Sequence, residues 1–273
     1  MTGIESGYVD VAGGRLYYEV EGEGPPITLI HAGVAHLRMW DEQVAAWRND
    51  HRVIRYDCRG FGRTVVDDVP YSNRDDLRAV LDHLEVDRTH LLGLSRGSMI
   101  ATDFTLEWPQ RVRSLTWVAG RLRGFDVDDP RLADTRPVME GLEKARDWER
   151  LVELMTQVWT DGPGQPSDRV DPNVRRRMIG WNMENYLADQ NPDQPIQPDV
   201  PAAERLAEIM VPTLLMWGTF DELGVLRSGE KMSAEICGAR SHVFEGVAHM
   251  VNLERPAEFN RLVREFVESV ERS

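Results

Sequence analysis

One serine in this chain lies in a spacing that can turn a hydroxyl into a nucleophile. Ser95 is the centre of the sequence Gly-Leu-Ser-Arg-Gly at 93–97, which follows the largely apolar run 89–92 and precedes a predicted helix. A glycine two residues away on each side lets the chain turn sharply from strand to helix and exposes the hydroxyl above the sheet. A serine needs such exposure, a base and a charge-stabilising pocket to attack carbon. The spacing therefore predicts Ser95 as a nucleophile, with a serine in a structural turn as the alternative.

An acid and a base follow the serine in the order that the nucleophile elbow uses. Asp221 lies in the loop after an apolar run at 214–218, and His249 lies in the loop after a short strand at 241–244. We expect His249 to take the Ser95 proton and pass it to the leaving group. Asp221 would hold the imidazole tautomer and stabilise its protonated form. The alternatives are Glu222 as the acid and a surface role for the histidine.

Charge that develops on a substrate oxygen needs amide donors already in place. The backbone N–H groups of Arg96, directly after the serine, and of Gly33, in the loop after an early strand, are the predicted oxyanion donors. This chemistry requires no cofactor. The histidines outside the site lack companions at ligand spacing, so we expect no metal site.

Strands and helices alternate around these residues. A hairpin is predicted at 8–20, and short buried strands at 27–30, 52–56, 89–92 and 112–119 are separated by helical stretches. Such alternation indicates parallel strands joined by helical crossovers. Amphipathic helices are predicted after Ser72 and from Pro256 to near the end of the chain.

The alternation stops between Gly120 and about Leu206, where proline-rich sequence separates helical pieces. We therefore expect an α/β core at 1–120 and 207–273 with a helical cap, or lid, inserted at 121–206. Three tryptophans of this insertion are candidates for lining an acyl pocket, although packing within the lid explains them equally well: Trp148, Trp159 and Trp181.

Composition limits the class of partner. The chain has 273 residues, with 32 basic and 46 acidic side chains and a net charge of −14. An acidic surface repels nucleic acid and anionic membranes, so we expect neither as a partner. Cys58 and Cys237 are predicted to be unpaired, buried thiols in a reducing compartment. The sequence shows no leader pattern or spanning segment, so we expect a cytoplasmic protein of unknown oligomeric state that acts on a small molecule.

Five ordered motifs resemble the α/β-hydrolase superfamily over nearly the whole chain. They are the His-Ala-Gly loop at 31–33, the Asp-Cys-Arg-Gly-Phe-Gly turn at 57–62, the elbow at 93–97, the acid loop at 218–221 and the histidine loop at 246–249. The resemblance implies a mostly parallel eight-stranded sheet with helices on both faces and an inserted helical lid. Within the superfamily the chain resembles small capped esterases, enol-lactonases and cofactor-free perhydrolases. It departs from the usual pattern at Ala32, Ser98 and Arg96.

The predicted activity is hydrolysis of a carboxylic ester or lactone of a small, partly apolar substrate through an acyl-enzyme. A C–C hydrolase, a lyase or a perhydrolase would use the same triad, and a ligand-sensing receptor built on a slow hydrolase is the non-enzyme alternative. A serine nucleophile argues against haloalkane dehalogenation and epoxide hydrolysis, which need a carboxylate at this position in this family.

Several polar residues near the motifs have structural explanations. His31 is expected to brace the oxyanion loop, Asp57 and Arg59 to form a turn-stabilising pair, and Asp103 to be a polar helix position. We also consider that Arg96, with Arg121 and Arg123, favours substrates that carry a carboxylate; ordinary ion pairs are the alternative.

Overall fold

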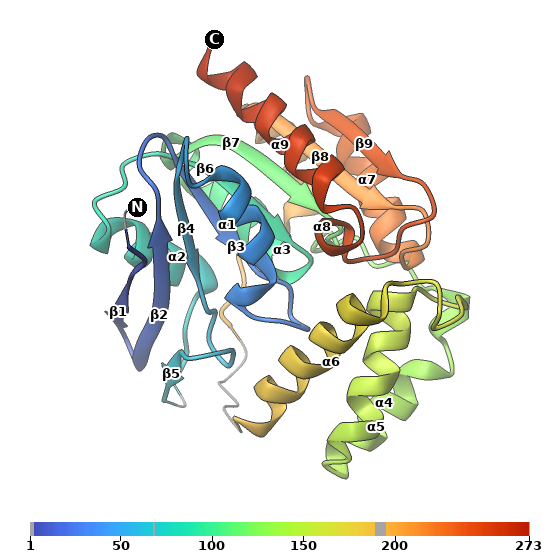
Figure 1. The fold of residues 1–273 in the computed structure, drawn as a ribbon. Coiled ribbons are helices and arrows are strands. Elements are labelled where there is room, and N and C mark those ends of the chain that lie inside the picture. Colours follow the sequence, from blue (N-terminus) through green and yellow to red (C-terminus); the bar gives the residue numbers. More distant parts are fainter. Residues whose placement is uncertain (1–2, 68, 189–194, 273) are drawn as a thin grey trace.

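A single mixed sheet runs through the molecule and carries helices on both faces (Figure 1). The computed structural model describes residues 3–67, 69–188 and 195–272. The strands of the sheet, in chain order, are β1 (Glu5–Val11), β2 (Gly14–Glu21), β3 (Pro26–Ile30), β4 (Arg52–Tyr56), β5 (Val65–Val66), β6 (Thr89–Leu94), β7 (Val112–Val118), β8 (Thr213–Gly218) and β9 (Arg240–Phe244).

The spatial order of the strands is β1-β2-β4-β3-β6-β7-β8-β9, and β5 pairs with β2 beside this path. Pairing is parallel from β4 through β3 to β9, and it is antiparallel where β2 meets β1, β4 and β5. The sequence predicted eight strands, and the described sheet has nine. The additional strand, β5, consists of only two valines, which is too short for the sequence to show a strand pattern.

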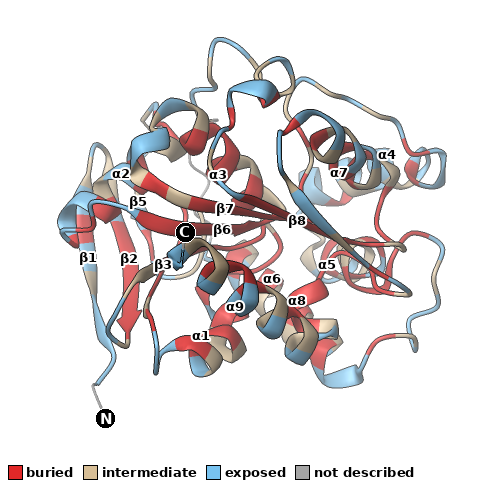
Figure 2. Cartoon of the chain, turned by 90° about the horizontal axis from the view of Figure 1, so that it is seen from above, coloured by how far each residue is buried: buried red, intermediate tan, exposed pale blue. Residues whose placement is uncertain are grey.

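Two groups of helices cover the sheet, as the view from above shows (Figure 2). Helices α2, α3 and α7 lie on one face, and α1 and α9 lie on the other. Their bounds are α1 (Asp41–Trp47), α2 (Asn73–His83), α3 (Arg96–Glu107), α7 (Leu223–Glu235), α8 (Val251–Glu254) and α9 (Pro256–Glu271). Every residue of β6 is buried between the two layers, which fixes the strand that delivers Ser95.

Local sequence accounts for the helix boundaries. The Ser72 hydroxyl caps α2 by accepting a bond from the Asp75 amide, and acidic residues in the first turn favour the positive end of the helix dipole. Helix α9 begins at Pro256 and buries an apolar stripe: Phe259, Val263, Phe266 and Val267. Both helices match the predictions from sequence.

Three helices lie between β7 and β8, and the second packs against both of the others: α4 (Thr135–Lys144), α5 (Trp148–Thr156) and α6 (Pro172–Leu187). A π-helical turn, Gln157–Asp161, follows α5, and the Asp171 side chain caps α6 as its Asp-Pro start predicts. No strand occurs among the described residues of this segment. Residues 189–194 of the predicted insertion lie outside the described ranges. Figure 1 shows α4, α5 and α6 grouped at one end of the sheet.

The two cysteines differ in exposure. Both are free, but only Cys58 is buried, whereas Cys237 is exposed. The prediction of two buried thiols is therefore wrong for Cys237, which lies in the turn between α7 and β9. Within the described part of the chain, the helices are too short or too polar to cross a bilayer.

Candidate active site

Ser95 stands at the turn between β6 and α3. Its backbone has φ 56° and ψ −116°, a conformation that L-residues rarely adopt. The Ser95 amide donates to the Val118 carbonyl at 2.8 Å, and its carbonyl accepts from the amide and hydroxyl of Ser98. These bonds hold a strained serine at the end of the central strand, which is the geometry of a nucleophile elbow.

The two glycines of the elbow are required by space. A Cβ on Gly93 would lie 2.1 Å from the Gly97 carbonyl oxygen, and a Cβ on Gly97 would lie 2.1 Å from the Ile30 carbonyl oxygen. Both contacts are with backbone atoms, which cannot move aside cheaply. The spacing in the sequence thus follows from the close approach of β6, α3 and β3.

His249 and Asp221 meet in the interior. The Asp221 carboxylate accepts a hydrogen bond from His249 Nδ1 at 2.8 Å, and both side chains are almost fully buried. Asp221 follows β8 and His249 follows β9, so they come from the same edge of the parallel sheet as Ser95. Because an ionised carboxylate only accepts hydrogen bonds, Nδ1 carries the proton and Nε2 is the basic nitrogen.

The surroundings of His249 favour its protonated form. Burial opposes protonation, but the Asp221 charge and hydrogen bond, together with the Glu222 charge, outweigh burial and raise the pKa of His249 above 6.5. Asp221 is itself held by the Glu222 amide at 2.7 Å and by an Arg131 bond to its carbonyl at 2.8 Å. An imidazole oriented and charge-stabilised in this way is suited to accept and return a proton.

Glu222 is turned away from this pair. Its carboxylate lies 2.9 Å from Arg121 Nε and 3.6 Å from Arg136 Nη2. Of the two neighbouring acids, Asp221 is therefore the one bonded to the imidazole. The charge of the Glu222 side chain nevertheless contributes to raising the pKa of His249.

The two residues predicted to supply oxyanion donors lie side by side. A Cβ on Gly33 would contact Cβ and Cδ of Arg96 at 3.8 Å. His31 fixes this loop: its Nε2 accepts from the Cys58 amide at 2.9 Å, and its Nδ1 donates to the Ala32 carbonyl at 2.7 Å. Burial lowers the pKa of His31 to about 3, so it is a neutral brace and a poor base. That agrees with its predicted role.

The pairing predicted between Asp57 and Arg59 is wrong. Asp57 accepts from the amides of Leu37 and Arg63 at 2.8 and 2.9 Å. Arg59 instead forms a buried, bidentate pair with Asp76 at 2.7 and 2.9 Å. Asp57 therefore stabilises the 57–63 turn through Arg63 within it and Leu37 outside it, and Arg59 links the turn to Asp76.

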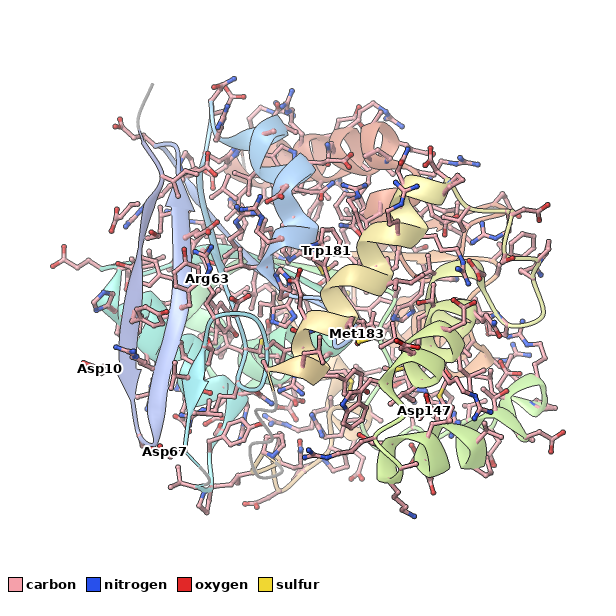
Figure 3. The ribbon with its side chains drawn as sticks, turned by 60° about the horizontal axis from the view of Figure 1, so that its bottom comes forward. Asp10, Arg63, Asp67, Asp147, Trp181 and Met183 are labelled. Atoms are coloured by element: carbon pink, nitrogen blue, oxygen red, sulfur yellow. The ribbon has the colours of Figure 1, made fainter. Side chains whose placement is uncertain are left out.

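The three candidate tryptophans occupy three different surroundings. Trp148 stacks on Tyr186 with ring centroids 4.9 Å apart. Trp159 lines a largely apolar cavity of about 260 Å³ that Glu222 also borders. Trp181 lines a separate, more polar cavity of about 330 Å³ that Arg63 also borders. Both residues are labelled in Figure 3. Of the three, Trp159 is therefore the one that borders a cavity beside the Asp221 loop.

One ion pair that sequence reasoning missed joins the helical segment to the histidine loop. Arg169, in the loop before α6, binds the Glu254 carboxylate at 2.5 and 3.1 Å and the Gly246 carbonyl at 2.9 Å. Glu254 in turn accepts from the Ala248 amide at 2.9 Å. Arg169 thus positions Ala248, the residue before His249, through Glu254. No local pattern marks Arg169, whose partner lies 85 residues away.

Metal ligands do not cluster in the described part of the chain: it contains no group of three or more His, Cys, Asp or Glu side chains that could hold an ion. The site brings together a strained serine, a buried imidazole–carboxylate pair and two adjacent residues, Gly33 in its loop and Arg96 at the start of α3. A nucleophile, a base and backbone donors are the parts that acyl transfer requires.

The fold and this set of side chains define a class of protein, and comparison with known families agrees. A model of the alpha/beta hydrolase family matches residues 29–262. The chain belongs to this family. A 2-hydroxy-6-oxononadienedioate/2-hydroxy-6-oxononatrienedioate hydrolase of Cupriavidus pinatubonensis is 31% identical over 264 residues, which cover 94% of this chain and 88% of the relative. The enzyme of the same description from Escherichia coli K12 is 30% identical over 271 residues, 93% of this chain and 91% of its own.

Solved structures share the architecture. Est816, described as an N-acyl homoserine lactone degrading enzyme, superimposes with a TM-score of 0.75 at 28% identity and covers 95% of this chain and 100% of its own. The esterase RhEst1 from Rhodococcus sp. ECU1013 has a TM-score of 0.80 at 23% identity, with 98% and 99% coverage. The second likeness is one of fold alone.

Proposed function

We propose that this protein is a serine hydrolase that cleaves a carboxylic ester or lactone with Ser95, His249 and Asp221 as its catalytic triad. The observation that carries the proposal is the buried bond between His249 and Asp221 at the sheet edge where the strained Ser95 emerges. In the proposed reaction Ser95 Oγ attacks the acyl carbon while His249 Nε2 takes its proton. The same imidazole then protonates the leaving oxygen, and water hydrolyses the acyl-enzyme by the reverse route.

The oxyanion would be stabilised by the backbone amides of Gly33 and Arg96. Their adjacency supports this role, as does the His31 brace beneath the loop. One such donor is typically worth about 10²–10³ in rate. No step calls for a cofactor.

The helices inserted between β7 and β8 are proposed as a cap over the site, with residues 1–120 and 207–273 as the core. Two contacts support this: Arg131 bonds the Asp221 carbonyl and Arg169 bonds the Gly246 carbonyl. The apolar cavity beside Glu222, bordered by Trp159 and Met139, suits the hydrocarbon part of a small substrate.

Cleavage of a C–C bond is the second candidate, and the names of the curated relatives favour it. Those names describe a 6-oxo compound, so the electrophile is again a carbonyl carbon and the same nucleophile and oxyanion donors would serve. The two reactions differ in the leaving group, which is an oxygen in an ester and a carbon in the ketone. A ligand-sensing receptor remains the non-enzyme candidate.

Turnover of 4-nitrophenyl butyrate, simple lactones and 2-hydroxy-6-oxononadienedioate by the wild type and Ser95→Ala tests the proposal. We expect Ser95-dependent turnover of the ester or lactone. Ser233→Ala, a substitution on the outer surface of α7, is the matched control and should retain wild-type rates. Faster Ser95-dependent loss of the 6-oxo compound would favour the C–C hydrolase. A stoichiometric burst without turnover would favour the receptor.

A further inference from the structure

The side chain of Arg96 is held beside the nucleophile by two contacts. Its guanidinium lies over the Phe61 ring, 5.0 Å from the centroid, and its Nη2 donates to Asn73 Oδ1 at 3.2 Å. The aliphatic stem passes the Gly33 loop, since a Cβ on Gly33 would lie 3.8 Å from Arg96 Cδ. The charge is therefore fixed on the side of the proposed oxyanion donors.

The nearby Asp76 carboxylate interacts with this guanidinium through its charge, but Asp76 is already held in its bidentate pair with Arg59. In the described ranges no carboxylate lies within ion-pair distance of Arg96, and its buried Nε has no hydrogen-bond partner. The two arginines considered with it from sequence behave differently: Arg121 pairs with Glu222 at 2.9 Å, and Arg123 pairs with Asp103 at 3.0 Å. Of the three arginines, Arg96 is the one without a carboxylate within ion-pair distance among the described residues.

Leaving such a charge unpaired is unfavourable. A partly buried guanidinium loses hydration that only a hydrogen-bonded anion replaces well. Arg96 also lies in the first turn of α3, where the helix dipole disfavours a cation. Carboxylates are abundant in a chain with 46 acidic residues, yet among the described residues none forms an ion pair with Arg96. A cation that is placed unfavourably and has no ion-pair partner within the protein is typical of a functional position.

We propose that the Arg96 side chain binds a carboxylate of the substrate, so that the preferred ester or lactone carries an anionic group on the side of the Gly33 loop. This inference rests on the proposed hydrolase function. The planar guanidinium suits a carboxylate because its N–H groups match the two oxygens. Phe61 and Asn73 restrict its rotation, so less conformational entropy is lost on binding.

Two esters of equal length test the proposal: 4-nitrophenyl hemi-adipate, which is anionic, and 4-nitrophenyl methyl adipate, which is neutral. The readout is the ratio of their kcat/KM values, which cancels effects common to both. We expect the wild type to prefer the anion by about 10–100-fold, the factor typical of a charge-assisted hydrogen bond. The preference should shrink as ionic strength rises.

Asn73→Asp neutralises Arg96 without removing it. The new carboxylate would take the place of the amide oxygen now 3.2 Å from Nη2, and an acid is favourable in the first turn of α2. The ratio should fall to near one. Asn73→Ala is the matched control, because it removes the same hydrogen bond without adding charge, and it should keep most of the preference.

A wild type without anionic preference, or equal effects of Asn73→Asp and Asn73→Ala, would overturn the proposal while leaving the hydrolase function intact. If no ester shows Ser95-dependent turnover, the hydrolase function fails instead. Calorimetric titration of Ser95→Ala with adipate and adipamide then tests Arg96 directly. Binding of adipate alone, abolished by Asn73→Asp, would support the carboxylate site, and absence of adipate binding would refute it.

Discussion

Replacing Arg169 with methionine should destabilise the protein by about 3–5 kcal/mol, because it leaves the Glu254 carboxylate buried without its cation. The side chains of this pair are only 13% and 6% exposed, so solvent cannot take over the role of the guanidinium. At about 2–4 °C per kcal/mol for a chain of this size, the melting temperature should fall by about 6–20 °C. Differential scanning calorimetry measures this directly.

A matched surface pair separates charge loss from burial. Arg261 and Glu265 form an i,i+4 pair on α9 with both side chains more than half exposed. Such a pair is worth about 0.3–0.5 kcal/mol, so Arg261→Met should lower the melting temperature by no more than about 2 °C. Equal shifts for Arg169→Met and Arg261→Met would refute the reasoning.

The double variant Arg169→Met/Glu254→Gln tests the cause of the loss. A glutamine is neutral and still offers an oxygen to the Ala248 amide, which now donates to Glu254 at 2.9 Å. The double variant should therefore be more stable than Arg169→Met alone, because it no longer buries an unpaired carboxylate at position 254. A double variant less stable than the single one would show that the buried charge is not the source of the effect.

Three further predictions follow from the site. The kcat/KM of an ester should decline in acid with a half-maximum above pH 6.5, because Asp221 outweighs burial in raising the pKa of His249, which must be neutral to act as a base. Asp221→Asn should move this limb to lower pH and reduce kcat by about 10⁴-fold; an unmoved limb would contradict the assignment. In urea titrations Gly97→Ala should lower the free energy of unfolding by at least about 1–3 kcal/mol, because its Cβ would clash with the Ile30 carbonyl. Gly180→Ala has open space around its Cβ and should raise the free energy of unfolding by about 0.5–1 kcal/mol. Similar effects of the two substitutions would contradict the clash.

Local pattern was sufficient wherever a short segment determines its own structure. The elbow at 93–97, the cap of α2 at Ser72 and the apolar stripe of α9 all depend on residues within a few positions of one another. Chain order and loop position also brought out Asp221 and His249, because the edge of a parallel sheet gathers the loops that follow its strands.

Partners far apart in the chain were not predictable from pattern. Asp57 and Arg59 are neighbours in sequence, but their side chains go to different parts of the fold. Trp159 lies in the π-helical turn Gln157–Asp161, and nothing in the local sequence indicated this departure from α-helical spacing. Arg169 lies in proline-rich sequence with no periodicity, so nothing local indicated its contact with the histidine loop.

Labelling with a fluorophosphonate tests the central claim most directly, because this probe reacts only with a serine activated by a nearby base. Peptide mass spectrometry of the labelled wild type should find one adduct, on Ser95, and the adduct should form far more slowly in Asp221→Asn. An unlabelled protein, or an adduct on a different serine, would contradict the proposal that the His249–Asp221 pair activates Ser95.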